Sequence, residues 1–314
     1  MPRTALPYLA LAFGIVALGL SAVFVRWANV PGAVSGFYRV GIAAAVMALP
    51  VLVAQRRAAA RRASSLPTSH NPTFPYLLYA VLAGLFFVGD LATWNTAVLI
   101  TNAANATLFG NTAPLWVGLG ALLLFKEKLA PRFWMGLVIA LAGAAVILGR
   151  DFLAHPTLGL GDLLALTTGF FYAGFFLATQ RAREGLSSLA AWWVSAATSA
   201  VGLLVVSLLL RQPLTGHPLN SYLNLIAVAL ITQVGGYLAI SYALGHLPAS
   251  LVAPTLLGQP VVTALLAIPL LGEPVTWAQV VGGALVLAGI MMVHHKDGDR
   301  RQTTPAGDRP SEQM

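Results

Sequence analysis

Long runs of apolar residues recur along the whole chain and are separated by short polar segments. Each run is about 20 residues long, the length that an α-helix needs to cross the hydrocarbon core of a bilayer, which is about 30 Å thick. The alternating pattern of a membrane β-barrel is absent, and a helix satisfies its own backbone N–H and C=O groups in lipid. The pattern predicts an all-α polytopic membrane protein with ten transmembrane helices, at 7–25, 31–54, 74–98, 102–125, 131–149, 159–180, 188–210, 222–243, 248–271 and 275–293.

The amino-acid composition agrees with a lipid environment. Apolar residues make up 58% of the 314 residues and charged residues only 9%, which differs strongly from soluble globular proteins. Cysteine is absent, so the chain has no disulfide, no thiolate metal ligand and no thiol nucleophile. The first apolar run is longer than a signal-peptide core of about 7–15 residues, so we interpret it as an uncleaved span. The polar segment 296–314 is expected to be a disordered cytoplasmic tail.

Basic residues in the connecting segments predict the orientation of the chain. Lys and Arg are retained on the cytoplasmic side of a membrane. Fourteen of them lie on the side of the N-terminus, four of these in a predicted loop at 56–73, against Arg26, Arg150 and Arg211 on the other side. Both termini are therefore expected in the cytoplasm. This bias accounts for the net charge of +8, so no nucleic-acid partner is needed to explain it.

One stretch of the sequence occurs twice. Residues 111–148 and 258–293 align at a single offset of 146, which pairs Pro114 with Pro260, Glu127 with Glu273, Gly136 with Gly282, and Gly143 with Gly289. The copies are five predicted spans apart, an odd number, so they face opposite sides of the membrane. We predict two inverted five-helix repeats, 1–150 and 151–295. Inverted repeats are typical of secondary transporters.

The motifs within these repeats resemble a known family. "LLLFKEKL" followed by "GLVIALAGAAVIL", and "PLLGEPV" followed by "GGALVLAGIMMV", are similar to the EamA-type transporters of the drug/metabolite transporter superfamily. The resemblance extends from Phe13 to Val293, and one departure is Lys126, where the family usually has Gly. It implies a ten-helix carrier with a central cavity between the halves, which moves small metabolites such as amino acids across the bacterial plasma membrane, most often outward.

Two charged residues lie deep inside predicted spans, away from the span ends. Arg39 and Asp90 are both a few residues from the middle of their spans, at similar height. Either one alone would cost at least about 2.5–3.5 kcal/mol at that depth, so we expect an ion pair, direct or shared through a substrate. A static salt bridge that fixes helix packing is one interpretation. In the other, Arg39 anchors a carboxylate, and Asp90 binds a cation or a proton, which would be the coupling ion.

Neutral polar residues near the midplane are further candidates for substrate contacts. Mid-span prolines interrupt helices, and interrupted helices at matching positions of two halves indicate a binding site, here around Pro114 and Pro260. Helix–helix hydrogen bonding is the alternative role for each amide. These candidates are Asn95, Asn105, Asn111, Gln233, Tyr237 and Gln259.

Aromatic and acidic residues complete the set of candidate site residues. Trp116 is the one tryptophan placed deep in a span, and we expect it to line the cavity with Phe170, Phe171, Tyr172 and Tyr237, although core packing is the alternative. Glu127 and Glu273 each precede a span, so we interpret them as caps of the following helix rather than as catalytic groups. With Pro114 and Pro260 they form the predicted structural and gating set.

Other classes of protein find little support in the sequence. The chain has no H-x-x-x-H, G-x-S-x-G or Walker-type motif, so we expect no enzyme, no cofactor and no metal site. A channel would show rings of charge. An intramembrane lipid-modifying enzyme and a non-transporting membrane scaffold remain the alternatives to a carrier. The expected partners are a small-molecule substrate and the lipid bilayer.

Overall fold

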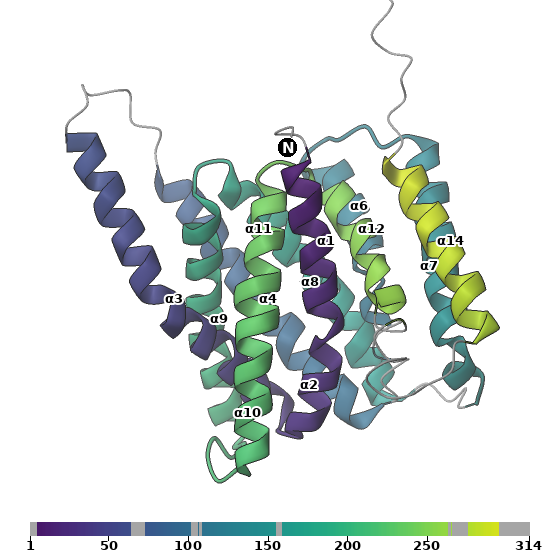
Figure 1. The fold of residues 1–314 in the computed structure, drawn as a ribbon, viewed down its shortest axis with the longest axis horizontal. Helices are drawn as coiled ribbons and strands as arrows, with labels where there is room; N and C mark the ends of the chain where they lie inside the picture. Colours follow the sequence, from purple (N-terminus) through teal and green to yellow (C-terminus); the bar gives the residue numbers. More distant parts are fainter. Residues whose placement is uncertain are drawn as a thin grey trace, which may run out of the picture.

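The computed structural model of the protein describes residues 5–63, 73–101, 106, 109–154, 159–262, 265 and 276–294. All elements within these residues are helical and form one bundle (Figure 1), which confirms the all-α class. The helices are α1 (Leu6–Gly19), α2 (Ser21–Ala28), α3 (Gly32–Ala63), α4 (Thr73–Ile100), α6 (Ala113–Leu124), α7 (Pro131–Ala154), α8 (Leu160–Arg183), α9 (Ser188–Leu209), α10 (Leu219–Ala227), η1 (Val228–Tyr237), α11 (Leu238–Leu244), α12 (Ala249–Thr255), η2 (Leu256–Gly258) and α14 (Trp277–His294).

Several of these helices match the predicted membrane spans. Within the described residues, 7 helical stretches are long and apolar enough to cross a membrane. The predicted spans 102–125, 131–149 and 248–271 contain the shorter apolar helices Ala113–Leu124, Pro131–Ile147 and Ala249–Val262. Parts of the first and third of these spans lie outside the described residues. A bundle of several membrane helices is thus confirmed, and the count of ten stays a prediction.

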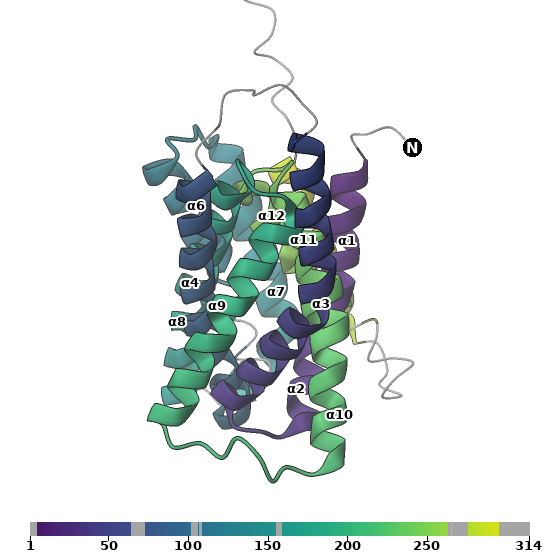
Figure 2. The ribbon, with the colours of Figure 1, turned by 90° about the vertical axis from the view of Figure 1, so that its left-hand side faces the viewer.

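The helices run between two ends of the bundle. α1 begins and α14 ends at the same end, at the top of Figure 1, and we call this the upper end. α9 and α10 are joined at the opposite, lower end (Figure 2). α10, η1 and α11 follow one another as one continuous rod that rises from the lower end to the upper end (Figure 1).

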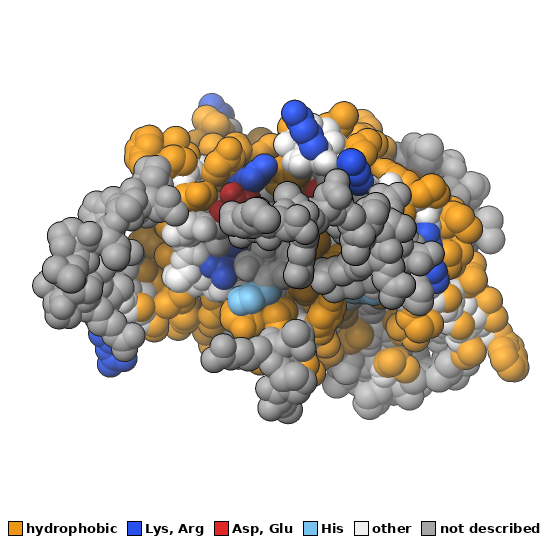
Figure 3. Space-filling view, turned by 90° about the horizontal axis from the view of Figure 1, so that it is seen from above, with side chains coloured by type: hydrophobic (Ala, Val, Ile, Leu, Met, Phe, Trp, Pro, Cys, Tyr) orange, Lys and Arg blue, Asp and Glu red, His pale blue; other side chains and the backbone are white. Residues whose placement is uncertain are grey.

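The periphery of the bundle is apolar. Large hydrophobic side chains such as Leu209 and Trp277 are 76% and 83% exposed. Seen from the upper end, much of the described surface is hydrophobic, and Lys and Arg side chains are scattered over it (Figure 3). Soluble monomeric proteins rarely expose apolar patches that are this large and continuous. This surface is therefore suited to contact with lipid chains.

α3 is longer than the sequence predicts. Residues 56–63 were expected to be loop, but α3 continues to Ala63. At about 1.5 Å per residue its 32 residues extend about 48 Å, more than the bilayer core. Hydropathy detects only the apolar part of a helix, whereas Ala and Arg are both strong helix formers. The loop prediction is therefore wrong for this stretch.

α7 and α14 pack backbone against backbone through glycines of the repeated stretch. A Cβ at Gly136 would lie 2.7 Å from the carbonyl oxygen of Gly289, and a Cβ at Gly143 would lie 2.6 Å from that of Gly282. Gly136 therefore contacts the repeat counterpart of Gly143, and Gly143 contacts the repeat counterpart of Gly136, as in two antiparallel helices. Such reciprocal contacts are those of two elements related by a two-fold axis.

The two copies also leave regular α-helix at corresponding places. α6 begins at Ala113, directly after a turn at 111–112. In the second copy, α12 gives way to η2, whose residues 256–258 correspond to 110–112 at the offset of 146. Pro114 and Pro260 lie just after these interruptions, where a missing backbone N–H is tolerated. The prolines therefore follow the breaks rather than bend continuous helices.

Candidate functional site

A buried polar cluster forms where α3 and η1 pack together. Arg39 of α3 is 1% exposed, and its Nη2 donates a hydrogen bond of 3.0 Å to Oε1 of Gln233 in η1. Its Nε has no hydrogen-bond partner within the described residues. Burying a guanidinium group is costly unless its donors find acceptors, and the Gln233 oxygen offsets part of that cost. Two of the predicted site residues are thus in direct contact.

Asp90 of α4 is 5% exposed and lies near Arg39 without pairing with it. The two side chains interact electrostatically, but their charged atoms are not within the 4.0 Å N···O distance of an ion pair. Within the described residues, the ion pair at such a distance is the one between Arg181 and Glu184. The expected direct Arg39–Asp90 pair is therefore not formed. Equal height in the membrane, which the sequence predicts, does not determine how each helix is rotated about its axis.

Two tyrosines stand beside these charges. The Tyr237 hydroxyl donates a hydrogen bond of 3.3 Å to the Tyr172 hydroxyl, and both side chains interact electrostatically with Arg39 and Asp90. The Tyr237 ring packs edge-on against Phe87, with ring centroids 4.9 Å apart. The cluster therefore combines a cation, a carboxyl group and hydroxyl groups with an aromatic wall.

Gln233 is presented by an unusual helix. η1 is a π-helix of 10 residues, a conformation that is rare at this length and frequent at functional sites. α1 supports it from one side, because the Thr232 hydroxyl donates to the Ala17 carbonyl at 3.2 Å. Gly236 permits this close packing, since a Cβ there would lie 3.1 Å from the Ala17 Cβ. The sequence signal available for this contact is the Gly-Gly pair that follows Gln233.

The other predicted amides lie apart from this cluster. Asn95 donates a hydrogen bond of 3.1 Å to the Gly32 carbonyl, which joins α4 to α3 as a packing contact. Asn111 lies in the turn before α6 and Gln259 directly follows η2, and no hydrogen bond of the described residues joins either of them to Arg39. Asn105 lies outside the described residues.

Trp116 is partly exposed and contacts one of its expected aromatic companions. It is 39% exposed on α6 and packs edge-on against Phe170, which is itself exposed, with ring centroids 5.8 Å apart. Within the described residues no ring contact joins these two aromatic side chains to Tyr172 or Tyr237, and a cavity shared with the tyrosines stays a prediction. Depth along a helix, the property used in the prediction, says nothing about which face a side chain occupies.

Glu127 has a different partner from the one predicted. Its carboxylate accepts a hydrogen bond of 2.7 Å from the Ser250 hydroxyl in α12, at the upper end. Within the described residues, the hydrogen bond of Glu127 is therefore with a helix distant in sequence and does not cap α7, which follows it. Lys126 beside it has a φ of 54°, the left-handed conformation that favours glycine, in agreement with the family's usual residue there. Glu273 lies outside the described residues.

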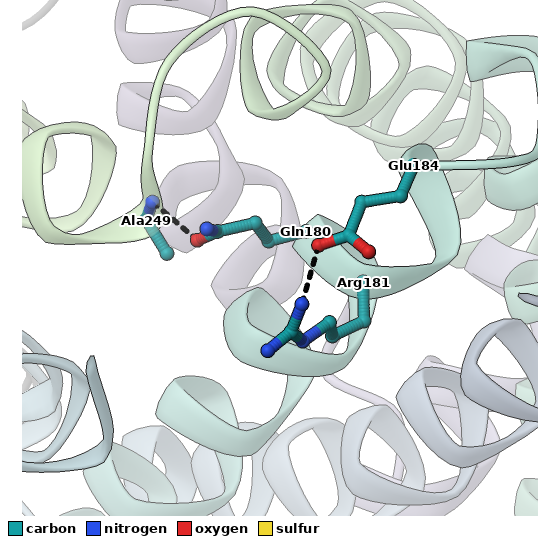
Figure 4. A network of polar contacts seen from close by, with 4 residues as sticks. All are labelled: Gln180, Arg181, Glu184 and Ala249. Atoms are coloured by element: carbon teal, nitrogen blue, oxygen red, sulfur yellow. Dashed lines mark hydrogen bonds and ion pairs between the residues drawn. The ribbon is translucent and has the colours of Figure 1, made fainter. Parts of the chain in front are cut away.

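Further contacts hold the upper end together (Figure 4). The Gln180 side chain accepts a hydrogen bond of 2.7 Å from the backbone N–H of Ala249, next to Ser250. Arg181 pairs with Glu184 at 2.7 Å and stacks over the Phe125 ring at 4.2 Å. The start of α12 is thus bound both to the α6–α7 turn and to the end of α8. Sequence reasoning missed Gln180 and Ser250, because each acquires its role only from a partner far away in the chain.

A bundle of apolar helices that encloses buried ionisable groups defines a polytopic membrane protein with an internal polar site. Within the described residues, no group of His, Asp and Glu is arranged to hold a metal ion. The profile of the EamA-like transporter family matches residues 5–149 and again residues 159–294. The chain therefore belongs to the EamA-like transporter family and is a multi-pass bacterial membrane transporter, which confirms the resemblance seen in the sequence.

Individual relatives agree with this assignment. The chain is 24% identical over 264 residues to the uncharacterized transporter YyaM of Bacillus subtilis (strain 168), covering 82% of each protein. It is 29% identical over 185 residues, or 55% of this chain and 61% of the relative, to a probable amino-acid metabolite efflux pump of Salmonella typhimurium. One solved crystal structure shares the fold with a TM-score of 0.71 and 20% identity, covering 93% of this chain and 97% of that one.

Proposed function

We propose that this transporter is an alternating-access carrier that exports small polar metabolites such as amino acids. The observation that carries the proposal is the buried Arg39, which reaches from α3 to Gln233 of the second half beside an unpaired Asp90. A zwitterion matches this arrangement, because its carboxylate fits Arg39 and its ammonium group fits Asp90. The small number of charges in the cluster disfavours polyanions.

The proposed architecture is a pair of inverted repeats, 1–150 and 151–295, with both termini in the cytoplasm. Three observations support it: the reciprocal glycine contacts of α7 and α14, the matching interruptions before Pro114 and Pro260, and the common end at which α1 begins and α14 ends. Interrupted helices in both halves are typical of carriers and have no role in a passive scaffold. In this scheme the upper end faces the cytoplasm.

Asp90 has two proposed roles. It binds the ammonium group of the substrate, or it carries a proton that is exchanged for the substrate during the cycle. Either role needs a buried carboxyl group that no arginine neutralises by direct contact. Asp90 meets both conditions. Proton coupling is therefore part of the proposal, and it is tested by measuring how the transport rate depends on pH.

Counterflow in proteoliposomes tests the proposal. We expect labelled amino acids to exchange across the membrane, Arg39→Gln to reduce the rate at least about tenfold, and Asp90→Asn to flatten its pH dependence. Arg26→Gln and Glu184→Gln, which make the same chemical changes at exposed positions, are the controls. Equal rates and equal pH profiles in all four variants would remove both residues from the mechanism. A protein that exchanges no metabolite would favour the scaffold or the lipid-modifying enzyme.

The substrate itself is best found in cells. Overexpression should raise the extracellular level of the exported metabolite relative to cells that express Arg39→Gln. A screen of culture medium for metabolites that differ between the two strains identifies the substrate without a prior choice. The same comparison establishes the direction of transport.

A further inference from the structure

On the edge of the Arg39 guanidinium group that binds carboxylates, only one of the two nitrogen atoms has a hydrogen-bond partner among the described residues. Nε and Nη2 lie on one edge of the group, and a carboxylate binds this edge through two parallel hydrogen bonds. Here Nη2 donates to a single neutral oxygen, Oε1 of Gln233, and Nε has no partner within the described residues. Arg39 is 1% exposed, so bulk water does not satisfy that donor.

A second unused donor lies on the same face of α3. Ser35 is one helical turn before Arg39, its side chain is fully buried, and its hydroxyl also lacks a partner within the described residues. Buried donors without acceptors are rare in folded proteins and each needs an explanation, such as a ligand. Arg39 Nε can only donate and the Ser35 hydroxyl is able to donate, so one acceptor group would satisfy both.

We propose that Gln233 is an intramolecular competitor for the substrate carboxylate. Its amide oxygen occupies the Nη2 position of Arg39, and a carboxylate displaces it to bind Nη2 and Nε together. The inference rests on the proposed transport function, and it narrows the substrate class to molecules with a free carboxylate. Gln233 thereby sets the affinity of the site without contacting the bound substrate.

The helix that carries Gln233 fits this role. Displacement requires the Gln233 side chain to leave Arg39, and Gln233 lies in a π-helix, a conformation that is rare overall and frequent at functional sites. η1 also continues directly into α11 toward the upper end. Release of Gln233 by the substrate would therefore loosen the contact between α3 and the rod that leads to the cytoplasmic end.

Acetate is a probe that needs no knowledge of the natural substrate. The melting temperature of the purified protein is followed by tryptophan fluorescence in sodium acetate and in sodium chloride at equal ionic strength. In the unmodified protein we expect acetate to raise it by about 2 °C relative to chloride. Gln233→Met, which keeps the length but removes the amide, should lower the half-saturating acetate concentration about tenfold, because a hydrogen bond to a charged group is lost from the competitor.

Two further variants complete the test. Gln233→Glu places a carboxylate on Arg39 permanently and should abolish the response to acetate, as should Arg39→Gln. An acetate response that survives in Arg39→Gln, or that is no tighter in Gln233→Met, would overturn the proposal, and so would the absence of any response. If Gln233→Met does not fold, Gln233→Glu against the unmodified protein decides the question. Acetate binding without any transport would instead refute only the proposed function.

Discussion

Arg39 and Gln233 are separated by 194 positions in the sequence, yet a hydrogen bond of 3.0 Å joins them in the buried centre of the bundle. One belongs to the first family match and the other to the second, so the bond links the two halves of the chain. In the proposed function the guanidinium group of Arg39 is the group that binds the substrate. The first prediction tests this group directly.

Arg39→Lys should keep the charge but lose the two-donor edge. Lysine is a compact point charge and cannot bind a carboxylate through two parallel hydrogen bonds. We expect the KM for transport to rise about tenfold or more while the protein still folds, as judged by gel filtration in detergent. Arg26→Lys, at an exposed position, should leave KM unchanged. An unaltered KM in Arg39→Lys would show that charge alone is sufficient.

Neighbouring glycines of α14 offer a matched test of the α7–α14 contact. A Cβ at Gly282 would lie 2.6 Å from the Gly143 carbonyl oxygen, whereas a Cβ at Gly283 would lie 3.7 Å from Val261. Gly282→Ala should destabilise the protein by about 1–3 kcal/mol through overpacking, and Gly283→Ala should be neutral or slightly stabilising. The melting temperatures of the two variants test this prediction. Equal melting temperatures would contradict the close packing of Gly143 against Gly282.

Lys126 occupies a backbone conformation suited to glycine. With a φ of 54°, its Cβ costs about 1 kcal/mol relative to glycine. Lys126→Gly should therefore raise the melting temperature by about 1–3 °C, despite the larger entropy of the unfolded chain. Lys128→Gly, at a position without positive φ, should lower it instead. The prediction fails if both substitutions act in the same direction.

The absence of cysteine makes the membrane topology directly testable. Ala130 precedes α7 and Thr276 precedes α14, and the two are counterparts at the offset of 146. In the cysteine-free background, a membrane-impermeant maleimide should label Ala130→Cys only from the cytoplasmic side and Thr276→Cys only from outside. Unmodified protein is the blank. Labelling of both from one side would contradict the inverted repeats.

The bond between Glu127 and Ser250 should show energetic coupling. Its 2.7 Å length and the charge on the acceptor indicate a strong hydrogen bond, reduced by partial exposure of Glu127. In a double-mutant cycle with Glu127→Ala and Ser250→Ala we expect a coupling of about 1 kcal/mol in unfolding free energy. Lys128→Ala combined with Ser250→Ala should be additive. Additivity in both cycles would mean that the contact contributes nothing to stability.

The sequence was most informative where the bilayer imposes the rule. A helix in hydrocarbon must be apolar and long, so the all-α class and most of the long apolar helices followed from hydropathy, and the family followed from the resemblance of the repeated motifs. Hydropathy did not predict the helix at residues 56–63, because a polar helix outside the hydrocarbon has no long apolar run.

Contacts between side chains were harder to predict, since they depend on how each helix is rotated. Arg39 and Asp90 share a height, but α3 turns Arg39 to Gln233. Trp116 is deep in its predicted span, yet it is 39% exposed and its ring contact is with Phe170 rather than with Tyr172 or Tyr237. Glu127 precedes α7 and instead binds α12. In each case the position along the chain was known and the partner was not.

Local composition and a repeated register are properties of the chain itself, and they alone determined that this protein is a duplicated bundle of membrane helices with few, conspicuous polar residues inside it. The tertiary structure decided which of these residues meet, because contacts such as Arg39 with Gln233 or Gly136 with Gly289 arise only when helices far apart in the sequence pack at one particular rotation. Close packing selects that rotation through the shapes of many neighbouring side chains at once.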